Sequence, residues 1–374
     1  MNRKIRIGFL ASTFTSPKLG GFSRHTINLI ESLGQANPDF EFFLYFNREL
    51  APSLLKRIPW AIPRILPLKP YLLWEQVGLP IQLSLDRIDI FHSTTNTGVP
   101  FFRPFFTAVV QTIHDTFTHD GLARIPRPIS LHGLRAFFGF RVSWWAAQSA
   151  DRFIAVSEST RADLAARFPG LRSKLTMVAN AADPGIFPGP VNEEILARYG
   201  LAPGYILCVA SGEERKNLGR LLESYRLFCD RENQKDEQAP KLVLVGNIRL
   251  SGNPDGLVQI PYCTEEVLLE LYRGAAFGVA PSLAEGFGFS AVEFGAVGRA
   301  AILSEIPPYI EIAKGAAPFF PPKNTESLAL WMEKLWNSPQ EREEWAQKLS
   351  RAAGRFTWAE AAKKTAEIYR ALCA

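Results

Sequence analysis

Two glutamates stand in an apolar, glycine-rich stretch that offers them no cation. Residues 281–298 read PSLAEGFGFSAVEFGAVG, and Glu285 and Glu293 are the only charged side chains among these eighteen residues. The glycines let backbone amides approach a ligand closely, and the start of the helix expected from residue 289 favours an anion. Carboxylates in such a place can accept hydrogen bonds from hydroxyl groups. The segment therefore predicts a site for a ligand that carries phosphate together with sugar or ribose hydroxyls.

Each glutamate also has a simpler interpretation. Ser290 and Glu293 have the spacing of a capping box, in which the glutamate reaches back to the start of its own helix. Taken alone, Glu293 fits that cap better than a ligand site. Glu285 has no comparable local role, although a glutamate in a loop is most often only solvated.

A second candidate lies in ASGEERKNLGRLL, residues 210–222, where a strand runs into a loop before a helix. Arg215 offers a planar fork to phosphate oxygens, and Lys216 offers a compact charge. The pair could neutralise a leaving diphosphate. As an isolated motif it is weak, because two cations at a helix start are usually solvated.

A third candidate is His114, which ends an expected strand just before Asp115. Without other information such a histidine is as often a structural imidazole as a site residue. The other four histidines form no metal-ligand spacing, and no Asp-x-Asp anchor for a metal-bound nucleotide occurs. The sequence therefore predicts no metal.

The elements that must position these residues alternate between short apolar runs and amphipathic stretches. In the first half, IRIGFLAST, EFFLYF, IDIFHST, TAVVQTIHD and RFIAVS are expected strands, and SRHTINLIESLG is a helix that stops at Gly34. After the Pro/Gly-rich linker at residues 180–190 the pattern starts again, with expected strands YILCVAS, KLVLVGN, LVQIP, FGVAPS and AAILSE. Repeated alternation of this kind predicts two doubly wound parallel sheets, whose strand ends would face one crevice.

Size and composition agree with this organisation. The chain has 374 residues, 47% of them hydrophobic and 21% charged, which suits two folded domains with a cleft between them. No uncharged stretch is long enough to span a bilayer, and the four cysteines form no metal or redox spacing. We expect a reduced, cytoplasmic protein.

Charge is unevenly distributed along the chain. Residues 1–185 hold 21 Lys and Arg against 13 Asp and Glu, a net charge of +8 (21 − 13). The arginines are scattered, and no nucleic-acid-binding motif occurs, so no nucleic-acid partner is expected. An anionic membrane surface is the alternative partner, and PFFRPFF (residues 100–106) and FFGFRVSWW (residues 137–145) have a suitable mixture of basic and aromatic residues. For both stretches a core strand or core helix is the favoured interpretation.

The whole set of motifs resembles the family-4 retaining glycosyltransferases, in the mannosyltransferase-like branch. The stretch at residues 281–298 is similar to that family's E-x7-E segment, and other segments match in the same order along nearly the whole chain. These are WEQVGLP (74–80), VVQTIHD (109–115), FIAVSESTRADL (153–164), ERKNL (214–218) and FTWAEAAKKTAEIY (356–369).

The resemblance implies a GT-B fold, with two Rossmann-like α/β domains facing across a cleft. It implies an N-terminal acceptor-side domain (1–185), a C-terminal nucleotide-sugar domain (186–355) and a last helix (356–374) that packs back on the first domain. The expected donor is a GDP- or UDP-linked sugar, with GDP-mannose slightly favoured and no cofactor. The expected acceptor is a saccharide or a lipid-linked intermediate of cell-surface polysaccharide, with peripheral contact at the inner membrane face.

Roles for individual residues follow from the resemblance alone. Arg215 and Lys216 would bind the donor diphosphate, Glu285 the sugar hydroxyls and Glu293 the ribose, while His114 would touch the transferring sugar. The loop beside the donor would contain Gly20 and Gly21, and the backbone of Gly286, Phe287, Gly288 and Phe289 would line the sugar and phosphate site. Asp115 would orient the local backbone or His114.

The chain departs from the family pattern in places that bear on loop geometry. Ser290 stands where proline is usual, and Phe294-Gly295-Ala296 replaces Ala-Met-Ala. No charged ligand-binding residue is lost.

Two other classes of protein remain as alternatives. An NAD-dependent Rossmann oxidoreductase would share the fold, but the chain has no G-x-G-x-x-G followed by an acidic residue about 20 positions later. A non-catalytic sugar-binding protein of the same fold is disfavoured, because all four charged site residues are present.

Overall fold

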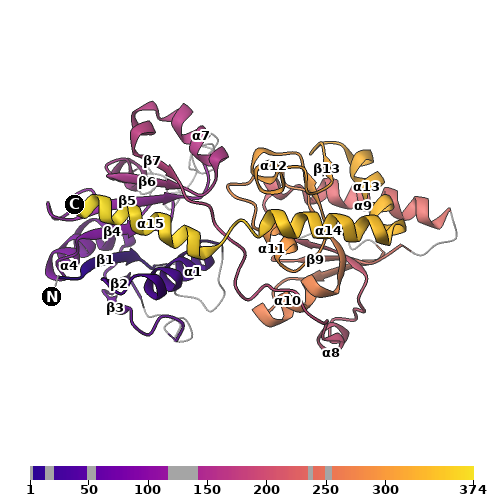
Figure 1. The fold of residues 1–374 in the computed structure, drawn as a ribbon, viewed down its shortest axis with the longest axis horizontal. Coiled ribbons are helices and arrows are strands. Elements are labelled where there is room, and N and C mark those ends of the chain that lie inside the picture. The colour runs from indigo at the N-terminus through magenta and orange to yellow at the C-terminus, as the bar shows by residue number, and fades with distance from the viewer. Residues whose placement is uncertain (1–2, 13–20, 49–55, 117–141, 235–238, 249–254) are drawn as a thin grey trace. The chain divides into compact units, whose positions relative to one another are not determined.

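The computed structural model describes residues 3–12, 21–48, 56–116, 142–234, 239–248 and 255–374. It divides the chain into two compact units (Figure 1). The first unit comprises residues 1–180 and 357–374, and the second comprises residues 181–356. The chain therefore passes from one unit to the other twice, after Asn180 and after Phe356.

The first unit contains a parallel sheet in the order β3-β2-β1-β4-β5-β6-β7. Parallel neighbours need crossover connections, which helices supply. The strands are β1 (Ile5–Leu10), β2 (Phe40–Phe46), β3 (Ile62–Ile65), β4 (Ile90–Ser93), β5 (Ala108–Ile113), β6 (Arg152–Ala155) and β7 (Leu175–Met177). The helices are α1 (Gly21–Ala36), α3 (Tyr71–Leu73), η1 (Trp74–Gly78), α4 (Leu79–Leu85), α7 (Glu158–Arg167), η2 (Pro169–Lys174) and α15 (Trp358–Cys373).

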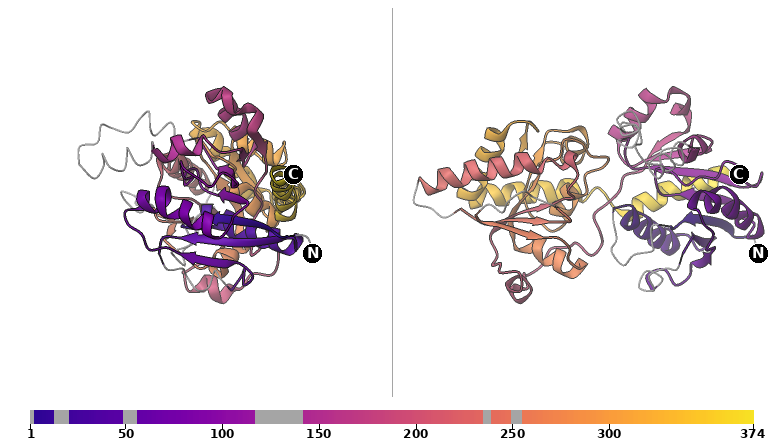
Figure 2. Two further views of the ribbon diagram at one scale, coloured as in Figure 1. Left: turned by 90° about the vertical axis from the view of Figure 1, so that its left-hand side faces the viewer. Right: turned by 180° about the vertical axis from the view of Figure 1, so that it is seen from behind.

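The second unit contains a parallel sheet in the order β10-β9-β8-β11-β12-β13. Its strands are β8 (Tyr205–Val209), β9 (Leu242–Val245), β10 (Leu257–Ile260), β11 (Ala275–Ala280), β12 (Ala301–Ser304) and β13 (Phe319–Phe320). Its helices are α8 (Glu193–Ala197), η3 (Glu214–Lys216), α9 (Leu218–Asn233), α10 (Glu265–Gly274), α11 (Phe289–Ala296), α12 (Pro307–Ala313), α13 (Thr325–Asn337) and α14 (Pro339–Ala353). Helices α9 and α13 pack on each other and on one face of the sheet (Figure 2).

In both sheets the strand order reverses at one point. The reversal lies between β1 and β4 in the first unit and between β8 and β11 in the second. In open α/β sheets, ligands bind outside the carboxyl ends of the strands at such a point. In the second unit, the loops that follow β8 and β11 carry Arg215, Lys216 and Glu285.

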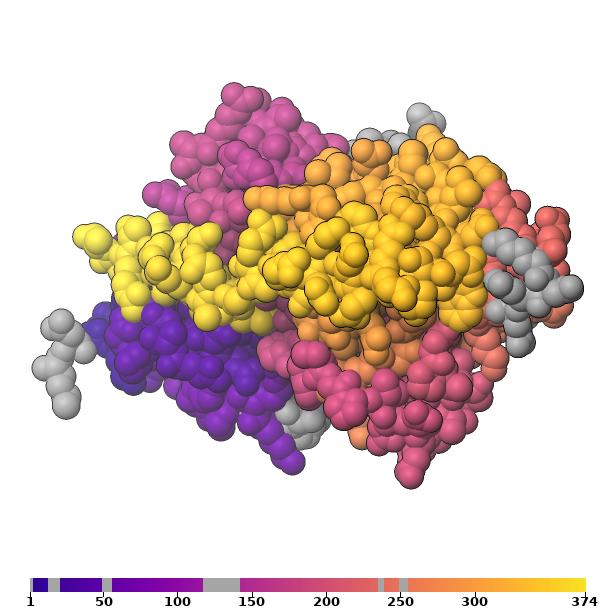
Figure 3. All heavy atoms as spheres, turned by 45° about the vertical axis from the view of Figure 1, so that its right-hand side comes forward, coloured from indigo at the N-terminus to yellow at the C-terminus, as the bar shows by residue number. Residues whose placement is uncertain are grey.

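The last helix belongs to the first unit, although most of that unit lies near the start of the sequence. Helix α15 packs against α1, and the space-filling view shows its residues in yellow over the indigo residues of the first unit (Figure 3). Arg370 donates a hydrogen bond to Asn37 Oδ1 at 2.8 Å, and Tyr369 Oη lies 2.6 Å from His92 Nδ1. These polar contacts join residues more than 270 positions apart.

Several elements differ from the sequence-based expectations. Helix α1 continues through Gly34 to Ala36, so Gly34 is not its stop. A Cβ at Gly34 would overlap the Trp60 indole, and the glycine therefore gives that ring its place beside the helix. Strands β3, β7 and β13 and helix α14 were not expected; each of these strands has at most four residues, too few to show a clear alternation.

The aromatic stretch at residues 100–106 is not the expected core strand. It forms turns between β4 and β5, and its phenylalanines are exposed, with Phe105 fully exposed and Phe102 75% exposed. The second stretch lies partly outside the described residues. Of the part that is described, residues 142–147 are helical, with Trp144 buried and Trp145 61% exposed.

The Phe294-Gly295 pair, which departs from the family pattern, has a packing role that fixes α11. A Cβ at Gly278 of β11 would overlap the Phe294 ring, and a Cβ at Gly295 would meet Leu349 O of α14 at 2.9 Å. Glycine at position 278 thus makes room for phenylalanine at position 294.

We predict that Gly278→Ala lowers the free energy of unfolding by roughly 1–3 kcal/mol, the usual cost of overpacking a core. Adding Phe294→Leu should restore part of the loss by making space for the new methyl group. Denaturant unfolding of both variants tests this, and a Gly278→Ala protein as stable as wild type would contradict it.

Candidate functional site

Three charged side chains of the second unit meet at the point where its strand order reverses. Glu285 Oε2 accepts a hydrogen bond from Arg215 Nη1 at 2.9 Å, and Glu285 Oε1 accepts one from Lys216 Nζ at 2.6 Å. Ser282 Oγ donates to the same Oε1 at 2.6 Å. The side chains of Arg215, Lys216 and Glu285 are 27%, 16% and 10% exposed, so the cluster is largely shielded but reachable. Below we call these three residues the charged cluster.

The local backbone explains why the two loops meet. Asn217 adopts a left-handed conformation with φ 57°, which ends η3 and starts α9. Its side-chain amide donates to Pro281 O at 3.0 Å, and Leu283 N donates to Arg215 O at 2.7 Å. These bonds hold the loop after β8 against the loop after β11. Asparagine is one of the few residues other than glycine that tolerates this backbone region.

The structure corrects the expectation that Glu285 has no cationic partner. Its partners come from a segment about 70 residues earlier, which the local sequence could not reveal. Burial alone would lower the pKa of Arg215, but the carboxylates of Glu285 and Glu213 raise it. Arg215 is therefore held charged where a diphosphate would need it.

Helix α11 begins next to Glu285, but not as the capping box predicted. Its N-cap is Gly288, with φ 108° and no side-chain hydrogen bond, and Ser290 is already inside the helix. A Cβ at Gly288 would meet the Tyr309 ring at 2.8 Å, so both conformation and space require glycine. The first turn of α11 contains no acidic residue. Gly286, Gly288 and Phe289 lie in this turn and the loop before it, whereas the Phe287 side chain is buried against the rings of Phe289 and Phe356.

Glu293 is buried and is not a helix cap. It is 4% exposed and accepts a hydrogen bond from Tyr272 Oη of α10 at 2.5 Å. Tyr272 also packs edge-on against Phe294, with the ring centroids 4.9 Å apart. The carboxylate is thus held between α10 and α11, while Glu285 lies in the charged cluster.

In the first unit, His114 follows β5 and is buried. Its Nε2–H donates to Thr94 O at 2.8 Å, which fixes the tautomer and leaves Nδ1 as the acceptor. Its backbone N–H donates to Asn96 Oδ1 at 2.8 Å, and the Asn96 amide is 3.3 Å from Asp115 Oδ1. Asn96 therefore links Asp115 to the backbone of His114 by hydrogen bonds. Burial lowers the pKa of His114 to about 4, so the imidazole is neutral near pH 7.

Sequence reasoning did not single out His25, which touches His114. The two rings are edge to face with centroids 4.6 Å apart, and His25 Nδ1 lies 2.7 Å from Asn180 Oδ1. The His25 ring also packs against Trp358 at 5.7 Å. Asn180 and Trp358 lie next to the two points where the chain passes between units. Residues this far apart carry no shared signal in the sequence.

The histidines make the stability of the first unit depend on pH. Burial lowers the pKa of His25 and of His92 well below the ordinary value, as it does for His114. Below about pH 6.5 the unfolded chain therefore binds more protons than the folded chain. The three histidines make their full contribution to the free energy of unfolding above about pH 6.5. That free energy falls as the pH is lowered towards 4, by up to about 1.4 kcal/mol per pH unit for each such histidine.

We predict that His114→Gln, which can keep a donor for Thr94 O, flattens this fall relative to wild type. Urea unfolding at pH 7.5, 6 and 5 measures the slope for both proteins. The comparison cancels other groups, including Glu75, whose pKa is raised by burial. Equal slopes for the two proteins would contradict the assignment.

Of the two glycines expected in the loop beside the donor, Gly20 and Gly21, the structure describes one. Gly20 lies outside the described residues. Gly21 is the first residue of α1 rather than part of a loop, and it is exposed. No described atom lies within 4 Å of a Cβ built on it.

The residues that the structure describes contain no group of three or more His, Cys, Asp or Glu side chains arranged to hold a metal ion. In the same part of the chain, no helix is both long and apolar enough to cross a bilayer.

Family models match both units. Glycosyltransferase Family 4 matches residues 19–185, and Glycosyl transferases group 1 matches residues 193–351. Among curated proteins, the chain is 29% identical over 187 residues to the serotype-specific mannosyltransferase WbdA of Escherichia coli, covering 47% of this chain and 23% of that protein. It is 25% identical over 240 residues to the O-antigen chain mannosyltransferase B of Escherichia coli, covering 60% of this chain and 61% of that one. The matched part of the chain thus spans about a quarter of the length of WbdA and about three fifths of the length of the O-antigen chain mannosyltransferase B.

Solved structures share the fold across nearly the whole chain. HepE of Anabaena, solved with UDP and glucose, has a TM-score of 0.75 at 16% identity and covers 98% of this chain and 100% of its own. WaaG, a glycosyltransferase involved in lipopolysaccharide biosynthesis, has a TM-score of 0.72 at 14% identity, with 97% and 99% covered. The sucrose-phosphate synthase of Thermosynechococcus elongatus has a TM-score of 0.72 at 15% identity, with 99% of each chain covered. The chain belongs to the family-4 glycosyltransferases, in their mannosyltransferase-like branch, and has the two-domain α/β GT-B fold.

Proposed function

We propose that this protein is a retaining hexosyltransferase that moves a sugar, with mannose favoured, from a nucleoside-diphosphate donor to a saccharide or lipid-linked acceptor. The observation that carries the proposal is the charged cluster at the carboxyl ends of β8 and β11. Two cations held beside a helix start that lacks acidic residues suit a diphosphate. Family membership and the mannosyltransferase relatives support this class of donor.

In the proposed reaction, the diphosphate takes the place that Glu285 now holds on Arg215 and Lys216. The acceptor oxygen bonds to the anomeric carbon as the bond from that carbon to the phosphate oxygen breaks. The acceptor proton passes to an oxygen of the leaving phosphate, on the face from which the acceptor attacks. The cations stabilise the charge that develops on the leaving group, which is where fixed charges lower a barrier most. No cofactor and no metal enter this scheme.

Other parts of the site have proposed roles that follow the family pattern. Glu285 would turn from the cations to the donor sugar hydroxyls, Glu293 would serve the ribose side of the site, and His114 would touch the transferring sugar. Gly20 and Gly21 and the backbone of residues 286–289 would line the donor. The neutral state of His114 suits hydrogen bonding to a hydroxyl better than binding a phosphate.

The donor base and the acceptor are further parts of the proposal. GDP-mannose is favoured over UDP-hexoses because the named curated relatives are mannosyltransferases of an O-antigen chain or a serotype. The same relatives also favour an acceptor from cell-surface polysaccharide synthesis, which the protein would reach by peripheral contact at the inner membrane face.

Thermal unfolding with a panel of ligands and EDTA tests the donor. The panel compares GDP, UDP, ADP, dTDP, NAD and the matching nucleotide sugars. A ligand at about 100 times its dissociation constant should stabilise the fold by roughly 2.7 kcal/mol, which is a shift of a few degrees. Selective response to one nucleoside diphosphate supports the proposal and names the base. Response to NAD alone would favour an oxidoreductase, and no response would favour a non-catalytic protein.

A further inference from the structure

The helical stretch from Tyr71 to Leu85, formed by α3, η1 and α4, exposes an apolar face. Its outward side chains are Tyr71, Leu72, Leu73, Val77, Ile81 and Leu85, which are 37–71% exposed. We call these six residues the outer face. The only charged residue in the stretch is Glu75, and it is fully buried. A surface helix normally turns polar and charged residues to water, so this face is built for a non-aqueous neighbour.

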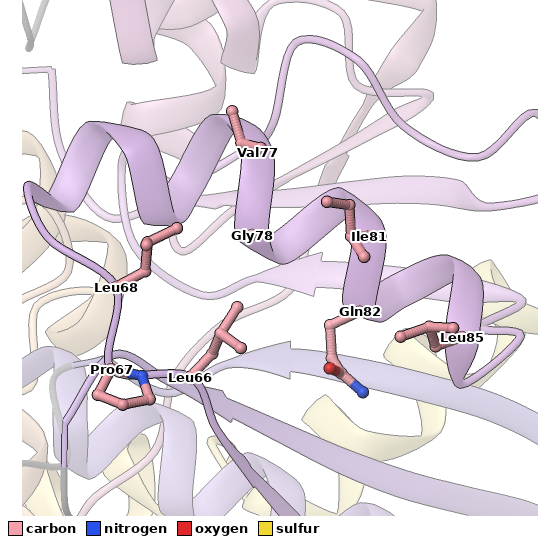
Figure 4. Close-up of a pocket in the computed structure, with 8 residues that line it drawn as sticks. All are labelled: Leu66, Pro67, Leu68, Val77, Gly78, Ile81, Gln82 and Leu85. Atoms are coloured by element: carbon pink, nitrogen blue, oxygen red, sulfur yellow. The ribbon is translucent and has the colours of Figure 1, made fainter.

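A groove runs beside the outer face. It has a volume of about 400 Å³ and lies between this helical stretch and the chain that follows β3 (Figure 4). Leu66 and Leu68 point toward the helix, and a Cβ at Gly78 would meet Leu66 Cδ2 at 2.6 Å, so glycine at position 78 lets the two segments approach. The lining residues are Leu66, Pro67, Leu68, Val77, Gly78, Ile81, Gln82 and Leu85, of which only Gln82 is polar.

Two exposed cations flank the helical stretch in the sequence, Lys69 before it and Arg87 after it. Residues 56–87 carry five cations, Lys56, Arg57, Arg64, Lys69 and Arg87, and two carboxylates. Both carboxylates are buried, Glu75 at 0% and Asp86 at 9% exposure, whereas Lys56, Lys69 and Arg87 are exposed. An anion that approaches either end of the helical stretch therefore meets an exposed cation, while the carboxylates of residues 56–87 are buried.

The apolar surface continues onto the exposed aromatic turns. The Gln76 side chain accepts a hydrogen bond from Phe101 N at 2.7 Å, which ties the helix to residues 100–106. Phe101 stacks on Trp145 with centroids 4.4 Å apart. Phe102 and Trp145 remain 75% and 61% exposed. Aromatic side chains beside apolar residues and cations are the composition that favours the bilayer interface.

We propose that the outer face docks into the headgroup region of an anionic lipid bilayer, with Lys69 and Arg87 on the lipid phosphates. This inference rests on the proposed function, because it places the first unit where a lipid-linked acceptor would be presented. An anionic bilayer matches both the apolar outer face and the flanking cations. It offers an apolar interior to the outer face and negative charge to Lys69 and Arg87. A second copy of the chain would bring the same cations to the contact, and like charges would repel each other.

Flotation of the full chain with vesicles tests the docking. Vesicles of phosphatidylglycerol and phosphatidylethanolamine are compared with phosphatidylcholine vesicles, at low and at high salt. The test variant is Ile81→Glu, and its matched control is Leu330→Glu on α13, because the two parent side chains are 57% and 50% exposed. We expect wild type and Leu330→Glu to float with anionic vesicles at low salt, and Ile81→Glu to bind roughly tenfold less. Lys69→Ala and Arg87→Ala should each weaken binding about fivefold, and salt should act in the same direction.

Each other outcome would overturn the inference. Wild type that stays with the soluble fraction, or Ile81→Glu that floats as wild type does, excludes the outer face as the docking surface. A wild-type dimer that Ile81→Glu converts to monomers in sedimentation would assign the face to a second copy. Thermal unfolding with nucleotides and no vesicles keeps the proposals separate: a retained nucleotide response with failed flotation removes only the membrane docking.

Discussion

Lys216→Ala is expected to lower turnover with a nucleotide-sugar donor by roughly 10²–10³-fold, the cost of removing one fixed group that stabilises charge in a transition state. Lys216 is 16% exposed and bonds Glu285 at 2.6 Å, so its ammonium is already positioned and partly desolvated. Arg215→Ala should have an effect of the same size, because Arg215 Nη1 bonds the other oxygen of the same carboxylate. Steady-state kinetics with the donor named by the ligand panel gives the size of both effects.

The matched control for these variants is Arg226→Ala, an exposed cation on α9, the helix that follows the charged cluster. It should leave turnover unchanged. Lys216→Ala should cost the fold only about 1–3 kcal/mol, since Glu285 keeps Arg215 and Ser282 as partners. A Lys216→Ala enzyme that unfolds normally and turns over at the wild-type rate would remove the diphosphate assignment.

Glu285→Gln is expected to separate binding from catalysis. The carboxylate of Glu285 forms ion pairs with both Arg215 and Lys216 in the structure. A diphosphate must therefore displace this carboxylate before binding to the two cations. Glutamine removes the competing charge while keeping the shape, and the affinity for a nucleoside diphosphate should rise by about tenfold, which corresponds to about 1.4 kcal/mol. Turnover should fall by roughly 10²-fold or more, because the amide accepts sugar hydroxyls less well than the carboxylate does.

Calorimetric titration of the nucleoside diphosphate and turnover of the nucleotide sugar measure the two effects separately. Tyr309→Phe provides a comparison, because Tyr309 Oη is 3.5 Å from Glu285 Oε1 and its loss leaves the two ion pairs intact. We expect the diphosphate affinity of Tyr309→Phe to stay close to wild type. If Glu285→Gln binds the diphosphate more weakly than wild type, the carboxylate supports the anion site instead of competing for it, and the displacement scheme is wrong.

The sequence and the structure agree best where a signal is local. Alternating apolar runs predicted parallel α/β sheets, and most expected strands and helices are present within a few residues of their expected bounds. Short strands such as β13, with two residues, carry too little pattern to be seen in sequence. The aromatic turns at residues 100–106 were misread for a related reason: composition cannot tell whether a phenylalanine faces a core or water.

For the site, the sequence by itself determined the candidate residues: two cations before a helix, and two glutamates eight positions apart in a glycine-rich segment. Only the tertiary structure decided their partners. It pairs Glu285 with Arg215 and Lys216, buries Glu293 against Tyr272, and sets His25 beside His114. The physical reason is that a parallel sheet brings together the carboxyl ends of strands that are distant in sequence, and the strand order that chooses those neighbours depends on packing of the whole unit.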